Sequence, residues 1–134
     1  METKSRFILL KHQAKKAGLH FDLRFKMPGK KDWDSYMIKK GIPIGSEKRM
    51  VVRTTIHSED EALFTGEIKF GYGTGIITKE DSGFADILRY KPDKHIVIRF
   101  HGSKLQGVYH FINLSRLEKG NINQYYFFRG RSLK

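Results

Sequence analysis

Short runs of aromatic and β-branched residues dominate the chain, and residues that favour turns separate them. Runs of this length are typical of β-strands, and no segment shows a sustained 3.6-residue period. The pattern predicts nine strands, at Arg6–Lys11, His20–Lys26, Ser35–Lys39, Arg49–Thr55, Thr74–Thr78, Phe84–Tyr90, His95–Phe100, Gly107–Leu114 and Gln124–Phe128. Turn signals stand at Met27-Pro28-Gly29, Gly41-Ile42-Pro43, Asp81-Ser82-Gly83 and Pro92-Asp93. Strands at this spacing predict an all-β fold, a single compact β-barrel of about eight or nine short, mostly antiparallel strands.

One short helical turn is expected within this pattern. Ser58-Glu59-Asp60-Glu61 precedes Ala62-Leu63-Phe64 and fits a capping box, with Ser58 as the N-cap and Glu61 reaching back. The 134 residues, 39% of them hydrophobic, suffice for one domain with a core and are too few for two. We therefore expect residues 1–134 to form one domain.

The charge balance indicates a class of partner. The chain has 26 Lys and Arg against 14 Asp and Glu, a formal net charge of +12. Such an excess favours a polyanion, and nucleic acid in particular, because neutralised phosphates release condensed counterions. The basic residues are spread through the chain, which predicts a charged face; examples are Lys15–Lys16, Lys30–Lys31 and Lys39–Lys40.

The chain has no cysteine, which limits the catalytic and metal-binding chemistry open to it. Disulfides, thiolate catalysis and zinc held by sulfur are excluded. A metal would rest on His, Asp, Glu or backbone oxygen, a donor set that suits Mn²⁺ or Mg²⁺ and also accepts Zn²⁺. The apolar run Phe7–Leu10 is too short for a signal peptide or a membrane span. We therefore expect a soluble intracellular protein, cytoplasmic or associated with the nucleoid, without membrane contact.

The predicted strand at 20–26 carries the most informative polar residues. Alternate side chains of a strand share a face, so His20, Asp22 and Arg24 point one way. Two potential metal ligands beside a guanidinium resemble a metal site with a phosphate clamp, and His12 could return as a third ligand if the two strands are neighbours. The same pattern also fits an ordinary amphipathic strand with a solvated polar face.

The order of the motifs resembles the 3′-phosphoesterase domain of bacterial DNA ligase D and its free-standing bacterial and archaeal relatives. The resemblance runs from Phe7 to about Phe128. The blocks that carry it are the Lys-His…His-x-Asp-x-Arg signature at 11–24, Ser35-Tyr36-Met37-Ile38-Lys39-Lys40-Gly41, Lys48-Arg49-Met50-Val51-Val52, the lone His57, Gly66-Glu67-Ile68, the glycine-rich segment 71–75 and the block 98–110.

This resemblance implies both an activity and a site. His12, His20 and Asp22 would bind a divalent metal, most typically Mn²⁺, with Zn²⁺ or Mg²⁺ as alternatives. The scissile phosphate would be surrounded by four further residues, Arg24, Lys40, Arg49 and His57. The implied function is a metal-dependent phosphoesterase of DNA repair that trims a 3′-terminal phosphate or ribonucleotide to leave a 3′-hydroxyl. Its partners would be DNA or DNA/RNA 3′ ends and, by analogy, a DNA ligase or polymerase.

Three positions differ from the usual family pattern and favour an alternative function without catalysis. Leu10 stands where Gln is frequent, Thr55 where an acidic residue is found, and Glu61 where a Tyr often contacts the phosphate. Together with the charge of +12, they are compatible with a non-catalytic nucleic-acid-binding or assembly protein that retains the barrel. A third hypothesis, an RNA-binding translation factor, rests only on basicity and barrel shape.

Two other features do not indicate a site. The glycine-rich segment 71–75 lacks the Lys-Ser/Thr ending of a phosphate-binding loop, so we expect a turn between barrel strands. His95, His101 and His110 have no ligand-like spacing, and we expect His101 and His110 to serve packing or hydrogen bonding in the last hairpin.

Overall fold

The computed structural model describes residues 3–71, 73–117 and 120–131, and these residues form nine strands and one short helix. The elements are β1 (Thr3–Ala14), β2 (Gly18–Lys26), β3 (Trp33–Ile38), β4 (Arg49–Ile56), α1 (Glu59–Ala62), β5 (Gly66–Ile68), β6 (Gly75–Lys91), β7 (His95–His101), β8 (Gln106–Asn113) and β9 (Gln124–Arg129). Over the described part of the chain, no helix is long and apolar enough to cross a membrane.

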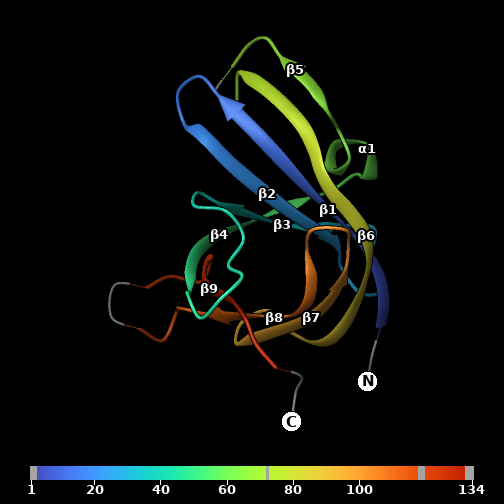
Figure 1. The fold of residues 1–134 in the computed structure, drawn as a ribbon, viewed down its shortest axis with the longest axis vertical. Coiled ribbons are helices and arrows are strands. Elements are labelled where there is room, and N and C mark those ends of the chain that lie inside the picture. The colour runs from blue at the N-terminus through green and yellow to red at the C-terminus, as the bar shows by residue number, and fades with distance from the viewer. Residues whose placement is uncertain (1–2, 72, 118–119, 132–134) are drawn as a thin grey trace.

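Eight of these strands close into an antiparallel barrel (Figure 1). The strand order is β1-β2-β3-β4-β9-β8-β7-β6, and pairing of β1 with β6 closes the circle. The ninth strand, β5, pairs with the beginning of β6. The predicted all-β barrel with one short helical turn is confirmed, although β1 and β6 are longer than the sequence pattern indicated.

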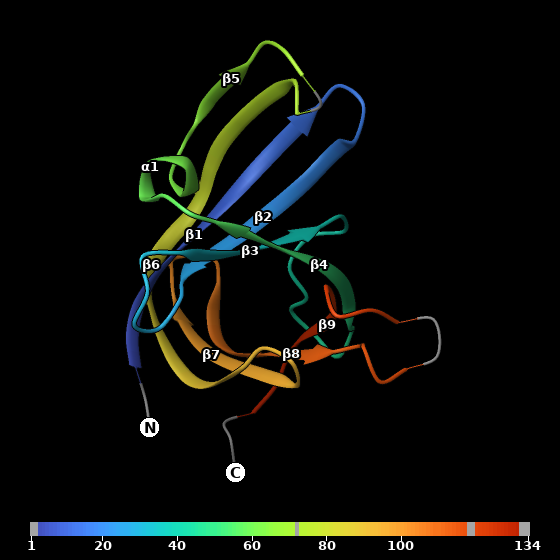
Figure 2. The same cartoon turned by 180° about the vertical axis from the view of Figure 1, so that it is seen from behind.

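Part of the sheet projects beyond the barrel. β6 has 17 residues; residues 84–91 pair with β7, whereas residues 75–77 pair with β5. β1 pairs with both parts of β6, so the ends of β1, β2 and β6 form an extension with β5 at its edge (Figures 1 and 2). Gly75 permits this pairing, because a Cβ there would lie 2.0 Å from the carbonyl oxygen of Gln13.

The turn predicted at Asp81-Ser82-Gly83 is wrong, and the two strands predicted on either side of it are one strand. Ser82 and Gly83 pair with β1, with only a register shift nearby. Gly83 is needed for close approach, since a Cβ there would lie 2.3 Å from the carbonyl oxygen of His101. Asp81 accepts hydrogen bonds from four backbone amides, one of them its neighbour's and three in the β7–β8 turn; the donors are Ser82, Ser103, Lys104 and Leu105.

The barrel interior holds the main hydrophobic core and one buried charge. The core consists of Phe7, Leu9, Leu23, Phe25, Tyr36, Ile38, Val51, Ala85, Ile87, Ile96, Ile98, Phe100, Leu105, Tyr109, Phe111, Tyr125 and Phe127. Within it the fully buried Asp34 accepts hydrogen bonds from Arg53 at 2.8 and 3.0 Å and from the hydroxyls of Tyr36 and Tyr90 at 3.1 Å. Burial raises the pKa of Asp34, and the nearby Arg53 offsets this only in part.

A second, smaller hydrophobic cluster lies on the outer face of the sheet, beneath α1. Its members are Ile8, Leu10, Trp33, Ile56, Ala62 and Ile77. The helix begins as predicted, with the Ser58 hydroxyl accepting a hydrogen bond from the Glu61 amide at 3.2 Å. α1 therefore covers an apolar patch next to the polar face of β2, and the sequence pattern did not predict this cover.

The environment of Asp81 generates a testable prediction. Burial alone would raise the pKa of Asp81, but the backbone amides that donate to its carboxylate outweigh this and lower it. The carboxylate then contributes stability that is present above its unfolded pKa of about 3.9 and is lost as the pH falls through the lower folded value. We expect Asp81→Asn to lower the free energy of unfolding by about 1–3 kcal/mol at pH 7, measured by urea denaturation, and the deficit to shrink below about pH 4.

Glu80→Gln is the matched control for this substitution. Among the described residues Glu80 pairs with the exposed Lys104, and such surface pairs contribute about 0–1 kcal/mol. Equal stability of Asp81→Asn and wild type at pH 7 would contradict the role given to Asp81.

Candidate metal centre

The pairing of β1 with β2 brings three potential metal ligands together. His12 and His20 are directly opposite in the register, and Asp22 follows two residues later on the same face of β2. The nearest donor atoms of the three side chains all lie within 4.8 Å of one another. The Asp22 carboxylate oxygen Oδ2 is 3.5 Å from His20 Nε2 and 4.0 Å from His12 Nδ1.

This polar face is buried. His12 and His20 are each 7% exposed and Asp22 is 9% exposed. The alternative of a solvated amphipathic strand is therefore wrong for this part of β2. On the opposite face Leu23 and Phe25 are fully buried in the core, and Phe21 is partly buried against it. A buried carboxylate between two imidazoles requires compensation, which a bound cation would supply.

His12 is held in an orientation that suits a metal ligand. Its Nε2 lies 2.9 Å from the carbonyl oxygen of Gly73. A carbonyl only accepts hydrogen bonds, so Nε2 carries the proton and Nδ1 is left with a lone pair on the side of Asp22. Metal-binding histidines commonly donate their second ring nitrogen to an oxygen in this way.

His20 has no comparable hydrogen bond. Its Nδ1 is buried and finds no partner among the described residues, while its Nε2 faces Asp22. A bound cation would engage Nε2, the ring nitrogen that faces Asp22, and would leave Nδ1 as it is. Two imidazoles and a carboxylate thus fit a divalent cation and leave coordination positions for water and a phosphate oxygen.

Arg24 is fixed next to the three candidate ligands. Its guanidinium donates to the Ser35 hydroxyl at 3.0 Å and to the carbonyl oxygens of Glu61 and Ala62, at the end of α1. Its Nη2 remains 3.9 Å from Asp22 Oδ2. Burial lowers the pKa of Arg24, and Asp22 and Glu61 offset this in part, but an arginine stays charged at neutral pH.

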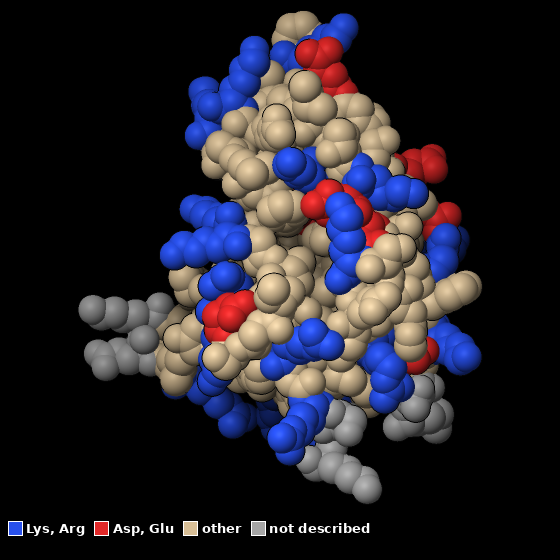
Figure 3. Space-filling model, in the orientation of Figure 1, with Lys and Arg blue, Asp and Glu red and all other residues tan. Residues whose placement is uncertain are grey.

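Lys40 and Arg49 line one recess, which lies next to Asp22 on the side of β3. The recess lies on β3 and β4 and has a volume of about 370 Å³; it is lined by Met37, Lys39, Lys40, Lys48, Arg49, Met50 and Val52. Met37 is the β3 residue opposite Asp22, so the recess begins one strand away from the candidate ligands. Lys and Arg side chains are also spread over the molecular surface seen in Figure 3, among fewer Asp and Glu.

The structure does not bring His57 to this group. His57 follows Ile56, which pairs with Trp33, and Trp33 pairs with Lys26. Lys26 is four residues beyond Asp22, roughly 13 Å of strand. The His57 side chain is 79% exposed, and its Nδ1 is 3.4 Å from Asp32.

The three positions that differ from the family pattern have distinct environments. Leu10 is fully buried in the cluster under α1 and lies opposite Asp22 in the register. Thr55 is an exposed residue of β4. Glu61 contributes its backbone carbonyl to Arg24 and its amide to the helix cap, and its carboxylate attracts the Arg24 guanidinium electrostatically.

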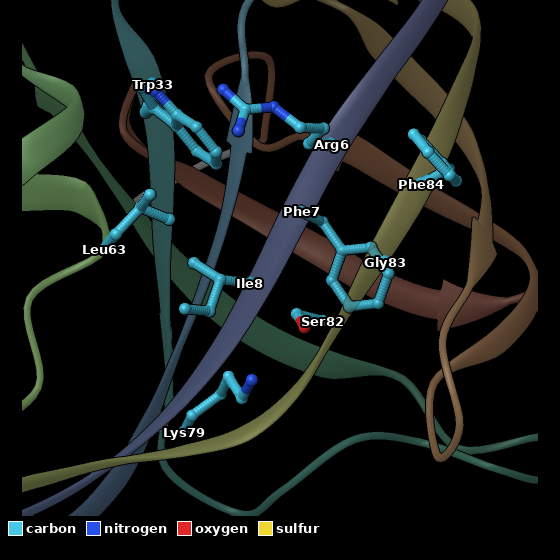
Figure 4. A pocket seen from close by; sticks show the side chains of 9 residues that line it. All are labelled: Arg6, Phe7, Ile8, Trp33, Leu63, Lys79, Ser82, Gly83 and Phe84. Atoms are coloured by element: carbon cyan, nitrogen blue, oxygen red, sulfur yellow. The ribbon is translucent and has the colours of Figure 1, made fainter.

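A second recess, shown in Figure 4, lacks the groups needed for metal binding. It has a volume of about 390 Å³ and is lined by Arg6, Phe7, Ile8, Trp33, Leu63, Lys79, Ser82, Gly83 and Phe84. Arg6 lies over the Trp33 ring at 5.4 Å, a cation–π contact. No carboxylate or imidazole lines this recess, which sets it apart from the surroundings of Asp22.

Gly73 and Ser35 are the supporting residues that the sequence interpretation missed. The glycine-rich segment was correctly expected to form a turn, but not to supply a carbonyl group to His12. Tyr72, in the same segment, lies outside the described residues. Ser35 could have been found from the β2–β3 pairing, which places it opposite Arg24.

We expect the protein to bind one divalent cation at this cluster. Changing a group that only supports a ligand typically weakens metal binding 10–100-fold, so Asp22→Asn, which removes a charged ligand, should weaken Mn²⁺ binding at least about 100-fold. Isothermal titration calorimetry on metal-free protein measures this affinity. Asp86→Asn is the matched control, since Asp86 also contacts a histidine, His101, but belongs to no cluster of three candidate ligands among the described residues. Equal losses in the two variants would contradict the site.

Comparison with known families agrees with this geometry. Residues 10–113 match the DNA ligase D 3′-phosphoesterase domain family. No curated protein is similar enough to count as a match. The matched region contains the three candidate ligands, Arg24 and the residues of the basic recess. The chain therefore belongs to the DNA ligase D 3′-phosphoesterase domain family.

Proposed function

We propose that the protein is a metal-dependent phosphoesterase that trims 3′-terminal phosphate or ribonucleotide from DNA or primer ends and leaves a 3′-hydroxyl. One observation carries the proposal: the buried cluster of His12, His20 and Asp22 lies between a fixed arginine and a basic recess. The family match supports an enzyme of this class acting at DNA ends.

His12, His20 and Asp22 hold the metal in this proposal, and Mn²⁺ is the ion we propose. Once bound, a divalent cation polarises a phosphoryl oxygen and lowers the pKa of water at its open positions. The hydrogen bond from Nε2 of His12 to the Gly73 carbonyl orients the ring so that Nδ1 faces Asp22 and the metal position. Burial of the cluster limits competition from bulk water for charged interactions.

Arg24, Arg49 and Lys40 supply positive charge around the phosphate. Arg24 uses Nε and Nη1 for structural hydrogen bonds, which fixes Nη2 on the side of Asp22. A guanidinium held in place in this way stabilises charge on phosphate oxygens without having to reorganise. Lys40, just after the end of β3, and Arg49, at the start of β4, line the same recess and add positive charge. The net charge of +12 favours association with a nucleic acid strand.

The activity test uses a 5′-labelled primer–template that ends in one ribonucleotide or in a 3′-phosphate. We expect shortening or dephosphorylation with Mn²⁺, none in EDTA, and loss of at least about 100-fold in rate in His20→Ala, because two ligands hold the metal weakly. His101→Ala is the control, since that exposed histidine contacts only Asp86 among the interactions described for it.

The outcome that would contradict the proposal is a folded, metal-binding protein that yields no product from either substrate. Salt-sensitive binding of the same primer without turnover would then support the alternative, a non-catalytic nucleic-acid-binding protein.

His57 needs a separate experiment. If it donates a proton to the leaving oxygen, as a histidine near the phosphate could, it has to approach the phosphate. General acid catalysis contributes about 10²–10⁴-fold to a rate. A fall of that size in kcat for His57→Ala, with little change in metal affinity, would support the role. An unchanged kcat would remove His57 from the catalytic group and agree with its exposed position beside Asp32.

A further inference from the structure

The recess on β3 and β4 has two chemically different halves. Met37, Met50 and Val52 are apolar, whereas Lys39, Lys40, Lys48 and Arg49 are cationic, and no carboxylate lines it. Phosphate alone would use only the cationic half. A nucleotide has an apolar, flat base as well as an anionic phosphate, and therefore complements both halves.

The apolar half lies close to the candidate metal ligands. Asp22, Met37 and Val52 are paired in register across β2, β3 and β4, and all three lie on the outer face of the sheet. Directly opposite residues of neighbouring strands have Cβ atoms about 4.5–5.5 Å apart. A phosphate at the metal cluster would thus place an attached nucleoside on Met37 without any strand having to move.

Met50 and Arg49 leave contacts in the recess that a ligand could use, although Lys48 lies over the Phe128 ring and Glu47 attracts Arg49 electrostatically. Met50 is 57% exposed, so its side chain is accessible to a ligand in the recess. The Nε atom of Arg49 is buried and has no hydrogen-bond partner among the described residues. Glu47, the acidic residue nearest in sequence, instead accepts hydrogen bonds from the amides of Ile44 and Gly45.

The size of the recess limits its occupant. A volume of about 370 Å³ is at the small end of the range for small-molecule sites, roughly 300–1,000 Å³. This suits one nucleotide and not a folded peptide or a length of duplex. Methionine sulfur forms favourable contacts with aromatic rings, so the two methionines could contact any of the nucleobases.

We infer that this recess is a nucleotide-binding site that holds the 3′-terminal nucleoside of the strand whose phosphate reaches the metal cluster. The inference rests on the proposed function and adds to it the place on the protein where the terminal nucleotide of the substrate binds. Met37 and Met50 contact the base, and Lys39, Lys48 and Arg49 neutralise the phosphate that joins this nucleoside to the strand.

Methionine methyl groups provide a direct test that does not depend on turnover. The chain has four methionines, of which Met37 and Met50 line the recess and the buried Met27 lies at the opposite end of β2. Protein labelled with ¹³C in its methionine methyl groups is titrated in EDTA with adenosine monophosphate and, separately, with inorganic phosphate. We expect adenosine monophosphate to shift the Met37 and Met50 signals, to leave Met27 unchanged, and to have a larger effect than phosphate.

Variants of exposed residues sharpen this test. Met50→Ala should weaken adenosine monophosphate binding about 2- to 10-fold through the lost sulfur–ring contact, and it also assigns the Met50 signal. Lys48→Ala should weaken binding about 2- to 5-fold, whereas Lys30→Ala, which removes an equally exposed lysine from the β2–β3 turn, should not.

Two results would overturn the inference. One is the absence of any shift at Met37 and Met50, and the other is equal shifts with phosphate and adenosine monophosphate, which would make the recess a simple anion site. Because the titration is run without metal, a protein that binds the nucleotide but does not turn over primer ends contradicts the proposed function alone. An active enzyme whose Met37 and Met50 signals do not move contradicts only the nucleotide site.

Discussion

The pairing of β1 with β2 on one side and with β6 on the other is the constraint on which both the barrel and the metal centre depend. The first pairing sets His12 opposite His20, and the second closes the barrel. Side chains alternate between the two faces of a strand, so a slip of one residue would turn His12 towards the interior. The buried run Phe7–Leu10 on β1 fixes the register, because each apolar face already has a hydrophobic cluster to fill.

The metal centre is buried although it lies outside the packed interior of the barrel. The outer hydrophobic cluster and α1 cover one side of it, and the turn that contains Gly73 covers another. Arg24 links these parts, since it contacts Asp22 and also binds the carbonyl oxygens at the end of α1. The side towards β3 and β4 carries the cationic recess, so the arrangement favours the approach of a phosphate from that direction.

The sequence predicted those features that depend on local pattern. Strand alternation was enough to place His20, Asp22 and Arg24 on one face, and motif order added His12. The Asp81-Ser82-Gly83 turn was wrong because turn-forming residues also serve long-range contacts: Asp81 binds the β7–β8 turn, and Gly83 permits close strand approach. The buried Asp34, the contact of Gly73 with His12 and the cover provided by α1 depend on tertiary packing, which a local pattern does not encode.

Anomalous diffraction from crystals soaked in Mn²⁺ tests the central claim most directly, because it locates the ion without reference to activity. The account predicts one strong peak within about 2.0–2.3 Å of His12 Nδ1, His20 Nε2 and an Asp22 carboxylate oxygen, with at least one coordination position facing the recess of Lys40 and Arg49. A peak held by other residues, or none at this cluster in crystals that bind Mn²⁺ elsewhere, would contradict it.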